Sequence, residues 1–158
     1  MEIELTQVMR DLTFRMRLLK ANQEQIGQVC LTERDLLILE LLNEHGPMSV
    51  SQLSLADGDA SDSTISIAIT RLWRDRRLVT KTINPENQRT TTIALTDKGK
   101  KIIETANKQR NERFQAFIEA INLTDSEGEV IVEVFLRAIK FFDERLGIRK
   151  EPISSGAR

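Results

Sequence analysis

Residues 61–95 read SDSTISIAITRLWRDRRLVTKTINPENQRTTTIAL, a short amphipathic helix followed at once by a β-hairpin. Ser61 is a residue type that caps helices, and the apolar residues after it recur at the helical period. We expect them to form the inward face of the helix: Ile65, Ala68, Ile69 and Leu72. β-branched residues then dominate 78–83 and 91–95, and the polar residues 84–89 between them are typical of a hairpin tip.

A second short helix precedes this segment. Residues 49–52, Ser-Val-Ser-Gln, form a capping-box pattern that predicts a helix to about Ala56, and residues 57–60, Asp-Gly-Asp-Ala, are a turn signal. Two short helices joined by a tight turn are a helix-turn-helix, and the hairpin after them predicts a winged helix-turn-helix. Upstream, Thr32 is expected to cap an apolar core helix that ends at Gly46-Pro47.

Long helices are predicted on both sides of this region. Apolar spacings of three and four indicate one helix from Ile3 to about Ile26, ended by Gly27. Thr96 is expected to cap a helix from Asp97 to about Ile121, and a capping box at 124–127 opens a last helix to about Leu146. All six Phe residues lie in these terminal helices. Their apolar faces need a partner, which a second copy supplies better than packing within one chain.

The predicted fold is therefore mainly α with a small β-hairpin wing, a winged helix-turn-helix with long N- and C-terminal dimerisation helices. We expect an N-terminal dimerisation helix in 1–30, the DNA-binding region in 31–100, C-terminal dimerisation helices in 101–147 and a disordered tail in 148–158.

Composition argues against several classes of protein. No window approaches the roughly 18 to 20 apolar residues of a membrane span, so we expect a soluble, cytoplasmic protein. One His, His45, and one Cys, Cys30, make no metal-ligand cluster, and neither a glycine-rich phosphate loop nor a GxSxG motif occurs. We therefore expect neither an enzyme nor a cofactor. Cys30 has no neighbouring cation to activate it and is interpreted as a small buried residue, with an oxidant sensor as the alternative.

Charge is unevenly distributed along the chain. Residues 1–70 hold 5 Lys and Arg against 11 Asp and Glu, whereas residues 71–101 hold 9 against 3. A basic segment confined to about thirty residues is typical of a surface that meets phosphates, although a solvated charged face would look the same.

The candidate DNA contacts follow from the predicted helix and hairpin. Outward residues of the helix would face a major groove: Ser61, Ser63, Thr64, Ser66, Ile67, Thr70 and Arg71. Ile67 could contact a thymine methyl group or be an ordinary surface residue. Arg89 at the hairpin tip suits a minor groove, while Arg71, Arg74, Arg76, Arg77 and Lys81 would contact phosphates or remain solvated. Trp73 is expected to pack at the root of the wing.

The order and spacing of these residues resemble the MarR-type regulators over about residues 31–100. The similarity rests on Leu31-Thr32, Gly46-Pro47-Met48-Ser49, the helix start at 61–66, Leu78-Val79, the wing tip at 84–89 and Ile93 to Gly99. The resemblance implies a homodimer that reads a pseudo-palindrome in duplex DNA, wing-tip contacts by Asn87, Gln88 and Arg89, and regulation by a small molecule or oxidant.

Three positions depart from the family pattern. Asn87 stands where the family usually has an Asp, and Ile67 replaces a basic residue. Arg76 or Arg77 replaces a helix-ending Gly, with one residue inserted. The sequence thus predicts a sequence-specific transcriptional regulator, a repressor released by a small-molecule effector. The alternative is a winged-helix protein-interaction module without DNA binding, which the acidic first seventy residues leave open.

Overall fold

A computed structural model describes residues 2–20, 23–58, 60–83, 85–86 and 89–146. The predicted tail at 148–158 lies outside these residues, as do Asn87 and Gln88 of the predicted wing contacts. The described chain divides into two compact units, residues 1–110 and residues 111–158. No helix in the described part of the chain is long and apolar enough to cross a membrane.

The N-terminal segment corrects one prediction. Helix α1 spans Glu2–Leu19, but the residues after it form two antiparallel strands, β1 at Gln23–Ile26 and β2 at Val29–Thr32, instead of continuing the helix to Ile26. Gly27 does not end a helix. It is the first residue of a two-residue hairpin turn and has a φ of 58°, a left-handed conformation that glycine adopts without a steric penalty.

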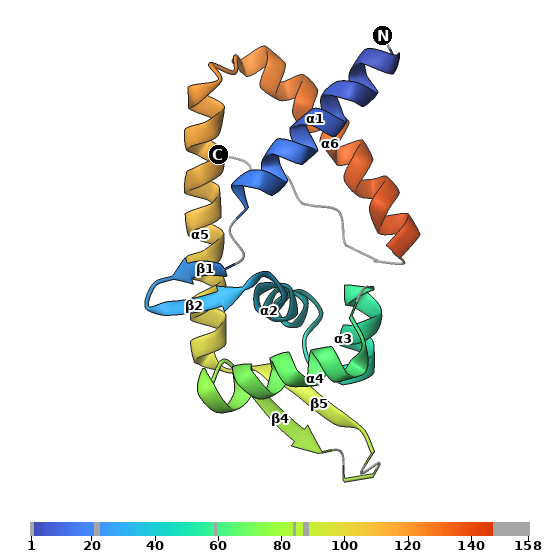
Figure 1. The fold of residues 1–158 in the computed structure, drawn as a ribbon, viewed down its shortest axis with the longest axis vertical. Helices are drawn as coiled ribbons and strands as arrows, with labels where there is room; N and C mark the ends of the chain where they lie inside the picture. The colour runs from blue at the N-terminus through green and yellow to red at the C-terminus, as the bar shows by residue number, and fades with distance from the viewer. Residues whose placement is uncertain (1, 21–22, 59, 84, 87–88, 147–158) are drawn as a thin grey trace. The chain divides into compact units, whose positions relative to one another are not determined.

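The winged helix follows from β2 (Figure 1). Its helices are α2 at Glu33–His45, α3 at Val50–Asp57 and α4 at Asp62–Thr70. The predicted caps are confirmed, because Thr32 and Ser49 each close a capping box, with Asp35 and Gln52 as partners. Each box satisfies backbone groups that the helix itself leaves unpaired, so the helix starts are fixed by local sequence.

The wing contains one strand more than the sequence predicts. Strands β4 at Val79–Ile83 and β5 at Thr91–Leu95 form the predicted hairpin, and β3 at Met48–Ser49 pairs with β5 to complete a sheet of order β3-β5-β4. Met48 stands opposite Ile93. This pairing attaches the base of the wing to the chain between α2 and α3.

The core of the first unit lies between these helices and the sheet. Its largest fully buried side chains are Ile26, Leu31, Leu36, Ile38, Leu39, Leu53, Ile65, Ile69, Leu72, Leu78, Ile93 and Ile103. The predicted inward residues are confirmed, since Ile65, Ala68 and Ile69 of α4, and Leu72 in the turn after it, are at most 2% exposed. The burial of this face determines which residues of α4 point outward.

Two long helices end the described chain. Helix α5 spans Asp97–Ala120, and Thr96 caps it by accepting a hydrogen bond from the backbone N–H of Gly99 at 3.0 Å. Helix α6 spans Asp125–Leu146, and its predicted capping box between Thr124 and Glu127 is present. The apolar residues of α6 all remain at least partly exposed.

Candidate nucleic-acid interface

Helix α4 is short, and its start is defined by Ser61. The Ser61 hydroxyl accepts a hydrogen bond from the backbone N–H of Thr64 at 3.2 Å, which caps the helix as predicted. Because Ile65, Ala68 and Ile69 are buried, the rotation of α4 about its axis is fixed. The opposite face of α4 is therefore exposed.

The outward face of α4 carries hydroxyl groups around one apolar side chain. Ser63 and Ser66 are exposed, and so is Ile67, at 67%. Thr70 is half-buried and donates its hydroxyl to the carbonyl of Ser66 at 2.9 Å. Thr64 is also half-buried, and its hydroxyl lies 3.0 Å from that of Ser61. The outward face of α4 therefore presents one projecting isoleucine among short hydroxyl side chains.

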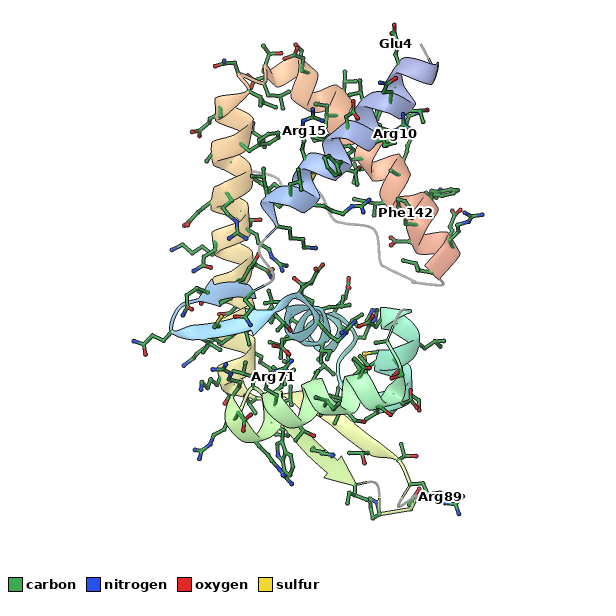
Figure 2. The ribbon with its side chains drawn as sticks, in the orientation of Figure 1. Glu4, Arg10, Arg15, Arg71, Arg89 and Phe142 are labelled. Atoms are coloured by element: carbon green, nitrogen blue, oxygen red, sulfur yellow. The ribbon has the colours of Figure 1, made fainter. Side chains whose placement is uncertain are left out.

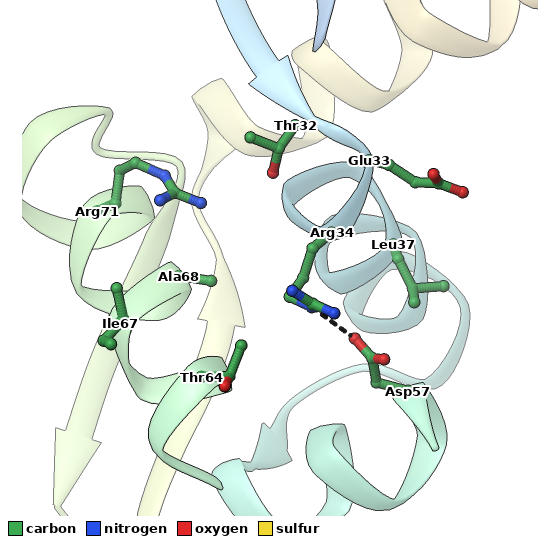
Figure 3. A pocket seen from close by; sticks show the side chains of 9 residues that line it. All are labelled: Thr32, Glu33, Arg34, Leu37, Asp57, Thr64, Ile67, Ala68 and Arg71. Atoms are coloured by element: carbon green, nitrogen blue, oxygen red, sulfur yellow. Dashed lines mark hydrogen bonds and ion pairs between the residues drawn. The ribbon is translucent and has the colours of Figure 1, made fainter. Parts of the chain in front are cut away.

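Arg71 differs from the exposed residues of the outward face of α4, because it forms an ion pair. It is half-buried, and its guanidinium is ion-paired with Asp35, a carboxylate that is 2% exposed at the start of α2. Figure 3 shows Arg71 and Ile67 on one side and the ion pair of Arg34 and Asp57 across from them. These residues line an open groove of about 640 Å³. Arg71 therefore has a structural partner, and its predicted phosphate contact stays a prediction.

The helix does not end at Thr70 but continues into a π turn at Arg71–Asp75. The Arg76 N–H reaches the Arg71 carbonyl at 3.2 Å, a bond that spans five residues instead of four. Arg77 then adopts a φ of 57°, whereas Arg76 has a φ of -104°. Arg77, and not Arg76, therefore has the left-handed conformation that glycine often adopts after a helix.

Three side chains meet where this turn passes into the wing. The Arg74 guanidinium carbon lies 5.2 Å from the centroid of the Trp73 ring, and the Lys81 Nζ lies 5.6 Å from it. Arg74 and Lys81 are exposed, and Trp73 is 36% exposed. Trp73 thus lies at the root of the wing, as predicted, but part of its ring is open to solvent. Its contact with two cations depends on residues of two elements, and no local pattern in the sequence indicates it.

The tip of the wing carries Arg89. Figure 2 shows Arg89 at the end of the β4–β5 hairpin that is away from the helices, and its side chain is exposed. Ile83, at the end of β4, is 59% exposed nearby in the sequence. The structure therefore presents an arginine on a projecting hairpin, in the position where a winged helix could reach a second groove.

The described residues hold no group of three His, Cys, Asp or Glu side chains that could bind a metal ion. His45 is the last residue of α2, with its side chain near Glu44 at the surface. Cys30 is half-buried in β2 rather than buried, and its thiol donates to the Gln23 amide oxygen at 3.2 Å.

Comparisons with known proteins agree with this geometry. A family model described as a winged helix DNA-binding domain matches residues 31–99. YpoP of Bacillus subtilis, an uncharacterised HTH-type transcriptional regulator, is 26% identical in an alignment of 140 residues. The alignment covers 85% of this chain and 96% of YpoP.

Solved structures share the fold over most of both chains. The MarR family transcription regulator SP03579 superposes with a TM-score of 0.68 at 21% identity, over 94% of this chain and 96% of that one. BpsR of Bordetella bronchiseptica, whose DNA binding is regulated by 6-hydroxynicotinic acid, superposes with a TM-score of 0.59 at 20% identity. The superposition covers 87% of this chain and 98% of BpsR. Residues 31–99 of the chain therefore match a winged helix DNA-binding domain, and the chain has the fold of a MarR family transcription regulator.

Proposed function

We propose that the chain is a sequence-specific regulator of transcription that binds duplex DNA as a homodimer. The observation that carries the proposal is the face of α4 opposite its buried residues, where Ser63, Ser66 and Ile67 are exposed together. Small hydroxyls can bond base edges or phosphates, and an exposed isoleucine can contact a thymine methyl group. A helix with this face, held by a packed core, suits the major groove.

The basic residues around α4 support the same reading. Arg74 and Lys81 are exposed between the helix and the wing, and Arg89 is exposed at the wing tip. Cations at these places would neutralise phosphates, and an arginine on a projecting hairpin could enter the minor groove. Asn87 and Gln88 are proposed as further wing contacts, although they lie outside the described residues.

The direct test is a fluorescence anisotropy titration of the protein against fragments of its genome, followed by sequencing of the bound fragments. We expect a recurring pseudo-palindromic site, with affinity that falls as salt rises because bound cations are released from the phosphates. Failure to bind any duplex at low salt would instead favour a protein-interaction module. The excess of acidic over basic side chains in residues 1–70 is the observation that favours this second candidate.

Dimerisation is proposed from the apolar surface of the terminal helices. In α1, Leu5, Val8, Met9 and Leu12 are each more than half exposed. In α6, the exposed large apolar side chains are Val130, Val132, Val134, Phe135, Leu136, Ile139, Phe141, Phe142 and Leu146. A monomeric protein in water rarely leaves so many large apolar side chains exposed on its helices, so a second copy is the partner that we propose.

Light scattering coupled to size exclusion would test this part. Phe135→Glu places a charge in the apolar face of α6, and we expect it to shift the mass toward one subunit. Leu55→Glu is the matched control, because Leu55 is 85% exposed on α3, outside the terminal helices. A wild-type protein that elutes as a monomer at micromolar concentration would contradict the dimer.

We further propose that a small-molecule effector weakens DNA binding by favouring a different spacing of the two winged lobes of the dimer. Such an effector shifts the population of conformations and needs no chemistry at the DNA surface. The regulation of BpsR by 6-hydroxynicotinic acid makes aromatic acids the first compounds to test. Release of labelled DNA on addition of such a compound, measured by anisotropy, would support the proposal.

A further inference from the structure

The side chains of Trp73, Arg74 and Lys81, here called the tryptophan cluster, join two different elements. Trp73 and Arg74 belong to the π turn after α4, whereas Lys81 lies on β4, the first strand of the wing. Both cationic groups lie within 6 Å of the ring centroid, at 5.2 and 5.6 Å. This distance is the range of a cation–π interaction, so one aromatic ring holds two positive charges.

Core packing alone does not account for Trp73. Leu72, which precedes it in the sequence, and Leu78 and Val79, at the start of the wing, are at most 1% exposed and belong to the core, while Trp73 is 36% exposed. A long cationic side chain loses conformational freedom when it binds an anion, and a cation already held against a ring loses less. The ring therefore prepares both cations for a ligand.

The place of the cluster identifies the kind of ligand. Arg74 follows Thr70 by one helical turn and so continues the outward side of α4 that carries Ile67. Among the residues that the structure describes, neither cation of the cluster is paired with a carboxylate. Two cations next to α4 and the wing fit the phosphates of a DNA strand that passes between these elements.

We propose that Trp73 is a positioning residue for DNA binding, which holds Arg74 and Lys81 at backbone phosphates of the bound duplex. This inference rests on the proposed function. It assigns the cluster to affinity and to salt dependence, because phosphate contacts carry no sequence information of their own. It also places the indole close to the DNA.

Trp73 provides its own spectroscopic probe, since the chain has one Trp and no Tyr. The protein is titrated with a labelled duplex selected from genomic DNA, and tryptophan emission and DNA anisotropy are recorded on the same samples. We expect emission to change along the same binding curve as anisotropy. Binding by anisotropy without any change in emission would overturn the inference and leave the proposed function intact, whereas absence of binding would overturn both.

A mutant cycle separates positioning from a general effect on folding. In the wild-type background, Arg74→Ala and Lys81→Ala should each weaken binding about three- to tenfold and reduce the slope of log affinity against log salt by roughly one. In a Trp73→Leu background the same substitutions should have clearly smaller effects. Trp73→Phe, which keeps an aromatic face, should restore most of the difference.

Lys101→Ala is the matched control, because Lys101 is an exposed cation on α5 outside the cluster. It should leave the salt slope unchanged. Equal effects of Arg74→Ala in the wild-type and Trp73→Leu backgrounds would overturn the proposal. All variants are compared at a temperature where thermal unfolding shows each of them to be folded, so a destabilised variant does not mimic the expected result.

Discussion

The guanidinium of Arg71, just after α4, is paired with the carboxylate of Asp35 in the first turn of α2. Asp35 also accepts a hydrogen bond from the backbone N–H of Thr32 at 2.9 Å, while its own N–H donates to the Thr32 hydroxyl at 3.1 Å. One buried carboxylate thus closes the cap of α2 and anchors the chain at the end of α4. The orientation of α4 depends on this contact as well as on its buried apolar face.

Replacing Arg71 by Ala should therefore lower stability. The substitution leaves the Asp35 carboxylate buried without its cation, and since Arg71 itself is partly exposed, we expect a loss of about 1–3 kcal/mol in the free energy of unfolding. Arg74→Ala is the matched control and should change it by less than about 0.5 kcal/mol, because Arg74 is exposed. Urea denaturation followed by circular dichroism measures both. Equal stability of the two variants would contradict the structural role of Arg71.

Arg77 offers a stabilising substitution. Its φ of 57° lies in the left-handed region, where a side chain costs roughly 1–2 kcal/mol that glycine does not incur. Arg77→Gly should raise the free energy of unfolding by about 0.5–1 kcal/mol, after the greater freedom of glycine in the unfolded chain is counted. The neighbouring Arg76, with a φ of -104°, provides the control, since Arg76→Gly should be destabilising. A lower melting temperature for Arg77→Gly than for wild type would refute the prediction.

Gly99 is needed where α5 leaves the wing. A Cβ at this position would lie inside van der Waals contact of the Leu78 carbonyl and 3.1 Å from the Leu95 side chain. Because the Leu78 carbonyl also accepts the Thr96 N–H at 3.0 Å, the backbone there cannot move without loss of a hydrogen bond. Gly99→Ala should cost about 1–3 kcal/mol through overpacking.

Gly128 in α6 is the matched glycine. A Cβ there would meet no neighbour closer than 3.9 Å, so Gly128→Ala should stabilise the helix by about 0.5–1 kcal/mol. Thermal unfolding of the two alanine variants should therefore move in opposite directions. Two shifts of the same sign would show that helix propensity, and not the contact with Leu78, governs position 99.

Local sequence patterns were sufficient to predict most of the winged helix. The caps at Thr32, Ser49 and Ser61 each depend on a residue three positions further along the chain, and the inward face of α4 follows from a period visible in the sequence. Such features need no knowledge of the rest of the chain. The same holds for the β4–β5 hairpin, whose β-branched strands and polar tip are contiguous.

Features that depend on distant residues were missed. Strand β3 is two residues long and exists because Met48 and Ser49 pair with β5, more than forty residues away. The sequence predicts helix where the β1–β2 hairpin forms, because Ile26 continues an apolar spacing and a glycine such as Gly27 can follow a helix as well as form a turn. The contacts of Arg71 with Asp35 and of Trp73 with Lys81 are likewise tertiary and leave no periodic signal.

Glu127 gives a prediction about pH. The Thr124 hydroxyl and then the Thr124 backbone N–H donate hydrogen bonds to its carboxylate, and these lower the pKa of Glu127 from its ordinary value of 4.5. The cap of α6 is therefore fully stabilising above about pH 4.5 and loses that contribution as pH falls through the lowered pKa. Carbon NMR of the Glu127 carboxyl group measures the titration. Thr124→Ala should return it toward 4.5, and a wild-type value at or above 4.5 would exclude the cap as described.

Arg89 tests whether the wing reads DNA. If its guanidinium enters the minor groove, Arg89→Ala should weaken binding to a selected duplex by about 1–3 kcal/mol. Arg89→Lys is the informative control, because it keeps the charge while losing the planar group that suits a narrow groove. Loss of affinity in both variants, greater on duplexes with A·T flanks than with G·C flanks, would indicate groove insertion. If Arg89→Lys binds every duplex as tightly as wild type, Arg89 contacts only a phosphate. If Arg89→Ala also binds with unchanged affinity, DNA is recognised by α4 and the tryptophan cluster alone.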